Sequence, residues 1–244
     1  MSRTAGLWIG CAGWTIPRTS AGSFAAGESH LHRYAQRFSA VEINSSFYRP
    51  HKPATYSRWA ASVPDDFRFA VKIPKAVTHE QRLRFDDGVL DAFCEAVAHL
   101  GGRLGCLLVQ LPPSLKFEPA VAEQFFTTLG KLCSAPAACE PRHASWFTPE
   151  AEALLASFKI ARVAADPAPV PEAAEPGGAA HLIYHRLHGS PRIYYSEYDR
   201  PFLQSLATKV RCEQLAGAQS WCIFDNTALG AATQNALELQ AELA

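Results

Sequence analysis

Residues 89–111 read VLDAFCEAVAHLGGRLGCLLVQL and place a helical pattern directly before a strand pattern. An apolar stripe with the three- and four-residue spacing of one helix face runs along the first half: Leu90, Phe93, Cys94, Val97 and Leu100. The pair Gly101-Gly102 then supplies a helix stop. The apolar run 106–111 that follows has the length and composition of a buried strand. The segment therefore predicts one helix followed by one strand.

Apolar runs of the same kind recur down the chain, and nearly every run ends in polar residues. The eight runs are 7–10, 40–44, 67–73, 106–111, 137–140, 161–166, 184–188 and 221–226. Their starts lie about 31 residues apart on average, close to the length of one strand–helix unit. Further helical stripes occupy 121–132, 202–210 and 236–243. Alternating strands and helices predict a parallel sheet.

Eight such units in 244 residues favour a single domain over residues 1–244. We predict an α/β fold in the form of one closed (βα)8 TIM barrel, with an open doubly wound sheet as the alternative. The interval 167–178 departs from the pattern, since PAPVPEAAEPGG holds four prolines and two glycines. It predicts an irregular long loop in place of a regular sixth helix. That loop is either a mobile lid over the site or an insertion that the surface tolerates.

The composition excludes several classes of protein. Apolar residues make up 48% of the chain and charged residues 19%, which excludes a disordered or fibrous protein. Lys plus Arg and Asp plus Glu number 23 each, so no net positive charge draws the chain to nucleic acid or to an anionic membrane. The sequence shows no secretory signal and no transmembrane run. The seven cysteines have no metal-type spacing, and we expect reduced thiols in a cytoplasmic protein.

The active site of such a barrel lies at the carboxyl ends of its strands, so the residues there are the candidates. Seven of the eight runs end in a charged or amide group. Glu42 and Asn44 lie two residues apart and share one face of their strand, as do Arg186 and His188. The other strand ends supply Lys72, Gln110, Glu140, Arg142, His143, Asp166, Asp225 and Asn226. Buried charge is costly without a partner, so such a ring must pair, hydrate or bind a ligand.

Four interpretations of this ring stay open. In the first interpretation the ring is an internal ion-pair network, since the positive charges of Lys72, Arg142 and Arg186 nearly balance the negative charges of the carboxylates. It holds a divalent metal, for which the ligand types are suitable although no metal-binding motif is present. It performs metal-free acid–base chemistry, with a carboxylate or His188 as the base. In the fourth interpretation, Lys72 is desolvated and crowded by arginines and forms a Schiff base.

Aromatic residues lie at or just after several strand ends: Trp14, Phe47, Tyr48, Trp146, Tyr194, Tyr195 and Tyr198. Together they predict the wall of a pocket for a flat or sugar-like ligand. His79, after the third strand, is placed to reach the same mouth. The glycine-containing loops 188–192 (HGSPR) and 225–232 (DNTALGAA) offer backbone N–H groups to a phosphate.

Several segments together are similar to one protein family. They are WIGCAGW (8–14), RYAQRFSAVEINSSFYRPHKPATYSRW (33–59), FRFAVKIPKAVTH (67–79), LLVQLPPS (107–114), EPRHASW (140–146), YHRLHG (184–189) and FDNTALGAATQNA (224–236). In this order they resemble the YecE-like family of TIM barrels, a family of unknown function. The resemblance runs from about residue 7 to the last helix. It implies the barrel fold and no known reaction.

The resemblance also implies a set of site positions. They are Glu42, Asn44, Tyr48, Lys72, His79, Gln110, Glu140, Arg142, His143, Trp146, Arg186, His188, Gly189 and Asn226. Two positions depart from the family pattern. Asp225 stands where an asparagine is usual, which argues against an essential catalytic role for it. Pro141 replaces an apolar or aromatic residue and alters the geometry between Glu140 and Arg142.

These observations predict an enzyme of the hydrolase, lyase or isomerase type that acts on a small polar or phosphorylated substrate at the barrel mouth. Glu140 and His188 are the acid–base candidates, and Lys72 and Glu42 complete the predicted catalytic set. The remaining family positions, together with Tyr195, are predicted to bind substrate. The alternative is a non-catalytic protein that binds a metabolite or nucleic acid at the same mouth. No motif defines a cofactor or an oligomeric state.

Overall fold

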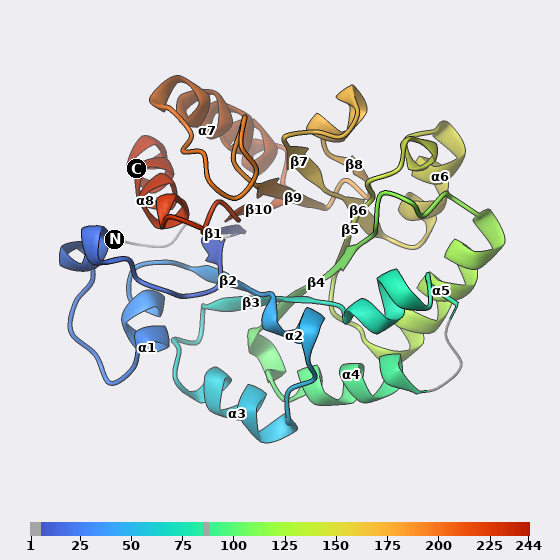
Figure 1. Ribbon diagram of the computed structural model, residues 1–244, viewed down its shortest axis with the longest axis horizontal. Helices are drawn as coiled ribbons and strands as arrows, with labels where there is room; N and C mark the ends of the chain where they lie inside the picture. Colours follow the sequence, from blue (N-terminus) through green and yellow to red (C-terminus); the bar gives the residue numbers. More distant parts are fainter. Residues whose placement is uncertain (1–5, 85–87) are drawn as a thin grey trace.

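The computed structural model describes residues 6–84 and 88–244, which form an α/β fold around one curved sheet with helices on its outside (Figure 1). The strands are β1 (Leu7–Ala12), β2 (Ala40–Ile43), β3 (Arg68–Lys72), β4 (Leu104–Gln110), β5 (Ala137–Glu140), β6 (Ile160–Arg162), β7 (Ala164–Asp166), β8 (Gly177–Gly178), β9 (Leu182–Leu187) and β10 (Gln219–Phe224). The α-helices are α1 (His30–Ala35), α2 (Ser45–Tyr48), α3 (Pro53–Ala61), α4 (Val89–Ala98), α5 (Pro119–Leu132), α6 (Pro149–Ser157), α7 (Arg200–Leu215) and α8 (Ala231–Leu243). Each of the eight predicted apolar runs overlaps a strand.

Local sequence signals set the starts of several helices. Residues 89–111 form α4 and β4 as predicted, with the glycine pair in a short 3-10 turn between them. Helices α5, α6 and α7 each carry proline in the first turn, where its missing N–H costs no hydrogen bond. The side chains of Thr148 and Asp199 cap α6 and α7 by accepting from the amides of Ala151 and Phe202.

The sheet is nearly closed into a barrel. Its strands follow the order β7-β9-β10-β1-β2-β3-β4-β5-β6-β8, and all neighbours are parallel except β6 and β8. Only Val163 separates β6 from β7. Strand β6 pairs with β5, whereas β7 pairs with β9. Strands β6 and β7 are consecutive in the chain but pair with different neighbours, so this short segment connects the two sides of the nearly closed sheet.

Two apolar layers pack against the sheet. One lies between the strands and the outer helices, and the other fills the interior of the sheet. The interior layer combines small residues such as Ala40 and Ala138 with three large rings. Trp221 stacks on Trp8 at 5.2 Å and on Tyr184 at 5.7 Å between ring centres. Among the helices that the structure describes, none has the length and apolar character needed to cross a bilayer.

The segment 167–178 contains a 3-10 helix (Pro171–Ala174) and β8, and no α-helix. This confirms the irregular connection that the prolines predict. The buried side chain of Arg162 donates to the carbonyls of Glu172 and Glu175 at 2.9 and 3.0 Å and pairs with Glu152 on α6. The amide of Gly178 donates to the same Glu152 carboxylate at 2.6 Å. These contacts hold the segment against β6 and α6, and a lid function stays a prediction.

Candidate functional site

The carboxyl ends of the strands bring six charged or titratable side chains together inside the sheet. All six are buried, and they come from strands far apart in sequence. They are Glu42 on β2, Lys72 on β3, Glu140 on β5, Arg186 on β9, and His188 and Asp225 just beyond β9 and β10. We refer to these six residues as the polar cluster. Tyr184 connects the cluster to the apolar interior, because its hydroxyl donates to Oε2 of Glu42 at 2.7 Å.

Arg186 lies at the centre of the polar cluster and contacts three carboxylates. Its Nε lies 3.1 Å from both oxygens of Glu42, and its Nη2 lies 2.7 Å from Oε1. Its Nη1 donates to Glu140 at 3.0 Å, and Nη2 lies 2.9 Å from Oδ2 of Asp225. Burial alone would lower the pKa of Arg186, but the three carboxylates outweigh burial and raise it well above its ordinary value. The structure therefore contains an ion-pair network centred on a permanent cation.

His188 is held through both ring nitrogens. Its Nδ1 lies 3.0 Å from Oδ2 of Asp225, and its Nε2 lies 2.8 Å from Oε1 of Glu140. Nε2 also lies 2.7 Å from Nη2 of Arg142, a group that only donates hydrogen bonds. Nε2 can donate to Glu140 or accept from Arg142, but it cannot do both at once. Nη1 of Arg186, a second donor, lies 3.3 Å from the same nitrogen. The position of a single proton therefore selects between one acceptor and two donors that are already in place.

The two carboxylates beside His188 are held in the ionised state. Burial would raise the pKa of Glu140, but Arg186, His188 and Arg142 together hold it well below its usual range. Nη2 of Arg142 lies 2.5 Å from Oε1 of Glu140. Burial would likewise raise the pKa of Asp225, and the charge of Arg186 and the hydrogen bond from His188 lower it. The cluster thus combines ionised carboxylates with a titratable ring.

Lys72 differs from the other cations because it pairs with no carboxylate in the part of the chain that the structure describes. Its Nζ stands 4.0 Å from the centre of the Phe47 ring, a cation–π contact. Burial, and then the charge of Arg186, lowers the pKa of Lys72 to about 8, although three nearby carboxylates act in the opposite direction. A lysine with this pKa carries a reactive neutral amine in a fraction of molecules at neutral pH.

Three buried polar atoms at this end of the sheet have no hydrogen-bond partner among the described residues. They are Nε of Arg142, Oδ1 of Asn44 and Oδ1 of Asn226. Asn44 follows β2, and Asn226 follows β10, where its Nδ2 donates to the carbonyl of Ser196 at 2.9 Å. Buried polar groups without partners cost free energy. One donor and two acceptors are therefore available to a polar ligand.

The loop after β9 places a phenol beside His188. Gly189 has a φ of 93°, and a Cβ there would lie 2.8 Å from the carbonyl oxygen of Ser196. Tyr194 also has a positive φ, and its amide donates to the carbonyl of His188 at 2.6 Å. The exposed Tyr194 ring stands edge-on to the imidazole, with 6.1 Å between ring centres. Burial and then Asp225 raise the pKa of Tyr194, so its hydroxyl keeps its proton.

Two predicted binding residues contact the loops at this end of the sheet: His143 contacts its own loop after β5, and Trp146 contacts the loop after β4. Nδ1 of His143 accepts a hydrogen bond from the Ser145 amide at 3.1 Å. Trp146 is buried, and its Nε1 donates to the carbonyl of Leu115 at 3.0 Å. Such contacts order the loop after β5, from which Arg142 reaches the polar cluster. Gln110 ends β4 in register with Glu140 and is half-buried beside it.

Three other predicted binding residues lie apart from the ion pairs. Tyr48 is 78% exposed, and Tyr195 is also exposed, with the Arg192 guanidinium 3.9 Å from its ring centre. His79 packs edge-on against Phe47, with 4.9 Å between ring centres. Through Phe47, His79 is one contact away from Lys72. Tyr48 and Tyr195 are placed to meet a larger ligand rather than the cluster itself.

The structure brings three further residues to the site: Tyr184, which the sequence analysis did not name, Asp225, which it listed at a strand end, and Tyr194, which it listed in the predicted pocket wall. Tyr184 lies two positions before Arg186 and on the same strand face, so the two-residue period carried a signal for it. Asp225 ends its strand as predicted, but its departure from the family pattern argued against a role, whereas it bridges Arg186 and His188. Tyr194 lies on an irregular loop, for which no periodic pattern exists.

The metal interpretation requires ligands that converge on one point. Asp166 instead accepts from the hydroxyl of Tyr198 at 2.8 Å, and Glu42 and Glu140 are directed at Arg186. Across the ranges 6–84 and 88–244, no three His, Cys, Asp or Glu side chains are arranged to hold a metal ion.

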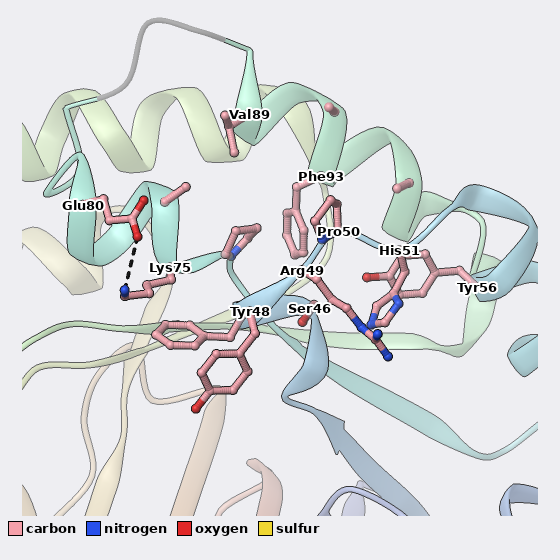
Figure 2. A pocket seen from close by; sticks show the side chains of 15 residues that line it. Ser46, Tyr48, Arg49, Pro50, His51, Tyr56, Lys75, Glu80, Val89 and Phe93 are labelled. Carbon is pink, nitrogen blue, oxygen red and sulfur yellow. Dashed lines mark ion pairs between the residues drawn. The ribbon is translucent and has the colours of Figure 1, made fainter.

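Two cavities border this end of the sheet. One of about 490 Å³ lies between α2, α3 and α4, and Figure 2 shows Tyr48, Phe93 and Val89 around it, with the Lys75–Glu80 ion pair at one side. Phe47 contributes to this cavity as well as to the contact with Lys72. The other, of about 420 Å³, is lined by residues 11–13 at the carboxyl end of β1 and by the loop that leads into α8.

Comparisons with known proteins place the chain in a family. It is 33% identical to the UPF0759 protein YecE of Escherichia coli over 106 residues, which are 43% of this chain and 38% of that protein. It is 27% identical to the UPF0759 protein YunF of Bacillus subtilis over 149 residues, 59% of this chain and 53% of that protein. The chain thus spans about two fifths and about half of the lengths of these relatives.

The fold is also similar to that of solved structures. A DUF72 family protein from Enterococcus faecalis superposes with a TM-score of 0.82 at 20% identity, covering 97% of this chain and 95% of the other. A DUF72 family protein from Thermotoga maritima gives a TM-score of 0.80 at 23% identity, covering 97% and 98%. The model of the family described as "Protein of unknown function DUF72" matches residues 8–244, and the chain therefore belongs to the DUF72 family.

Proposed function

We propose that this protein is an enzyme that transfers protons to and from a small polar or anionic substrate at the polar cluster. The observation that carries the proposal is His188, whose Nε2 lies 2.8 Å from Glu140 and 2.7 Å from Arg142. A histidine with a carboxylate on its other nitrogen has a fixed ring orientation, as a general base requires. A proton transfer of this kind is common to isomerases, lyases and hydrolases.

The other cluster residues support distinct roles in this proposal. Arg186 holds Glu42 and Glu140 in place through ion pairs, and its charge lowers the pKa of Glu140. Arg142 is part-exposed, with 16% of its side chain accessible, and is the guanidinium best placed to bind an anionic group. Lys72 adds a second cation at the end of β3, where it stabilises negative charge that develops on a substrate.

The proposal also extends to the fold and to the compartment. We propose that the sheet is a (βα)8 barrel in which β6 and β7 are one interrupted strand and β8 is an addition. The support is the pairing of β6 with β5 and of β7 with β9 across the single residue Val163. Five of the seven cysteines are buried free thiols, which supports the cytoplasm as the compartment.

Hydrogen–deuterium exchange tests the function without knowledge of the product. The protein is incubated in D2O with small carboxylates and sugar phosphates that carry a C–H bond next to a carbonyl, and loss of the C–H signal is followed by ¹H NMR. We expect exchange with at least one compound and a loss of 100-fold or more in His188→Gln, on the scale of general-base catalysis.

The matched control is His181→Gln, because His181 is exposed just before the start of the same strand. It should exchange at the wild-type rate. Equal rates in His188→Gln and the wild type would contradict the proposal. Ligand binding by thermal shift without exchange would instead favour the non-catalytic binding protein.

A further inference from the structure

Lys72 is positioned differently from the lysines on the surface. Lys209, for example, is half exposed and pairs with Glu175 at 2.7 Å. Lys72 is buried at the end of β3, and its Nζ faces the Phe47 ring rather than a carboxylate. The neighbouring cation is Arg186, which is itself fully engaged with three carboxylates.

An amine in such surroundings is a nucleophile rather than a structural cation. Only the neutral amine has a free electron pair, and burial beside another cation favours that form. With a pKa of about 8, roughly a tenth of the molecules carry neutral Lys72 at pH 7 and about half at pH 8. An ordinary surface lysine is almost entirely protonated at both pH values.

We propose that Lys72 forms an imine with the carbonyl carbon of a small anionic aldehyde or ketone, an inference that deepens the proposed proton-transfer function and rests on it. The ammonium first releases one proton. The nitrogen electron pair then forms the C–N bond, the carbonyl π pair moves to oxygen, and a second proton passes from the nitrogen to that oxygen. The resulting hydroxyl takes up one further proton and leaves as water, while the nitrogen electron pair forms the C=N bond. One ammonium and one carbonyl become one iminium and one water, with no oxidant or reductant.

Formation of the iminium makes a substrate C–H proton acidic enough for His188 to remove. A positively charged C=N group withdraws electrons, so a proton on the neighbouring carbon becomes more acidic. Removal of that proton by Nε2 leaves an enamine, and its return gives back the iminium. Water then hydrolyses the imine and releases the carbonyl product. Lys72 and His188 thus perform two halves of one reaction.

The unpaired polar atoms define the rest of the substrate. Nε of Arg142 is a buried donor without an acceptor, which suits a carboxylate or phosphate oxygen. Oδ1 of Asn44 and Oδ1 of Asn226 are buried acceptors without donors, which suit hydroxyl groups. Ile43 on β2 pairs with Val71 on β3. Asn44 directly follows Ile43 and Lys72 directly follows Val71, so Asn44 and Lys72 lie at the same level of adjacent strands. The substrate class is therefore a hydroxylated carbonyl compound with one anionic group.

Reductive trapping with glyoxylate tests the imine directly. Glyoxylate is the probe because it is the smallest molecule with both an aldehyde and a carboxylate. The full chain is incubated with glyoxylate and cyanoborohydride at pH 7.5, and adducts are counted by intact mass and located by peptide mapping. We expect one rapid adduct on Lys72, absent in Lys72→Arg and formed at least tenfold more slowly in Arg142→Gln. Neutral glycolaldehyde should react with Lys72 at least tenfold more slowly than glyoxylate.

The control variant is Lys209→Arg, which should retain the Lys72 adduct. Adducts spread over exposed lysines, or equal labelling of the wild type and Lys72→Arg, would overturn the imine. If exchange that depends on His188 persists without a Lys72 adduct, the proton-transfer function stands and Lys72 acts only as a cation. If exchange is also absent, both proposals fail.

Discussion

At the scale of single residues, the polar cluster contains one cation that forms no ion pair among the described residues. Arg186 has three carboxylate partners, and Glu140 and Asp225 are also held by His188. The Nζ of Lys72 instead faces the Phe47 ring at 4.0 Å, and the three carboxylates act on it without direct contact. A buried charge without an ion pair lowers stability. Perturbed pKa values such as that of Lys72 are typical of active sites, where they serve the chemistry.

The first prediction concerns the titration of Lys72. Reductive ¹³C-methylation of the lysines, followed by NMR from pH 6 to pH 11, should show one methyl resonance with a midpoint near pH 8, because burial and Arg186 disfavour the charged form. Lys72→Arg should remove that resonance. A Lys72 midpoint near that of the surface lysines would contradict the electrostatic account.

Much of the cluster is predictable at this scale, and the reason is the two-residue period of a strand. Arg186 and His188 share a face, and the structure brings them to Glu42 and Glu140 from strands about 140 and 46 residues away. The partners of each charge are not predictable, since pairing depends on the curvature of the whole sheet. The side chain of His143 contacts its own loop and that of Trp146 contacts the loop after β4. The sequence does not predict these contacts, because loop geometry, unlike strand geometry, has no period.

At the scale of elements, the loop after β9 packs beside His188. Gly189 turns the chain with a positive φ, and its amide donates to the hydroxyl of Tyr198 at 2.8 Å. Tyr194 links this loop to the next, because its carbonyl accepts from the amide of Ala228 at 3.0 Å. This hydrogen bond therefore connects the loop after β9 to the loop after β10.

A pair of glycine substitutions tests this loop. Gly217→Ala, at a φ of 83° with no atom within 4 Å of the added Cβ, should cost about 1–2 kcal/mol of unfolding free energy. Gly189→Ala combines a φ of 93° with a Cβ only 2.8 Å from a backbone oxygen, and it should cost roughly 1–3 kcal/mol more. Urea denaturation measures both values. Equal costs would show that the loop relaxes freely around position 189.

The elements themselves follow from the sequence more fully than the loops do. All eight apolar runs and the helical stripes at 89–100 and 121–132 correspond to observed strands and helices. The prolines at 167–176 correctly predict that the segment 167–178 contains no α-helix. The break at Val163, which divides one run into β6 and β7, is not visible in the sequence, because it arises where the sheet changes pairing partner.

At the scale of the whole molecule, the polar cluster joins strands from both ends of the chain. Glu42 on β2 binds Arg186 on β9, 144 residues away, and Tyr184 donates to the same carboxylate. Glu42→Ala removes a partner from both Arg186 and Tyr184, and it leaves the buried guanidinium without one of its carboxylates and the buried hydroxyl without its acceptor. It should lower the free energy of unfolding by about 3–5 kcal/mol.

The control for that variant is Glu175→Ala, which removes a surface ion pair with Lys209. Because both partners are about half exposed, its cost should be less than about 1 kcal/mol. Thermal denaturation of both variants at neutral pH makes the comparison. A Glu42→Ala protein as stable as Glu175→Ala would show that the network contributes nothing to closure of the sheet.

The central claim is that the polar cluster is a functional site that the fold maintains at a cost in stability. The unfolding free energy of Lys72→Met tests it most directly. The pKa of Lys72 is lower in the folded state than in the unfolded state. The unfolding free energy of the wild type therefore rises between about pH 8 and the pKa that Lys72 has in the unfolded chain. We predict that Lys72→Met is more stable than the wild type at pH 7 by about 1–3 kcal/mol and that the difference shrinks at pH 10. A variant that is less stable at pH 7 would show that Lys72 is a structural cation and would contradict the account.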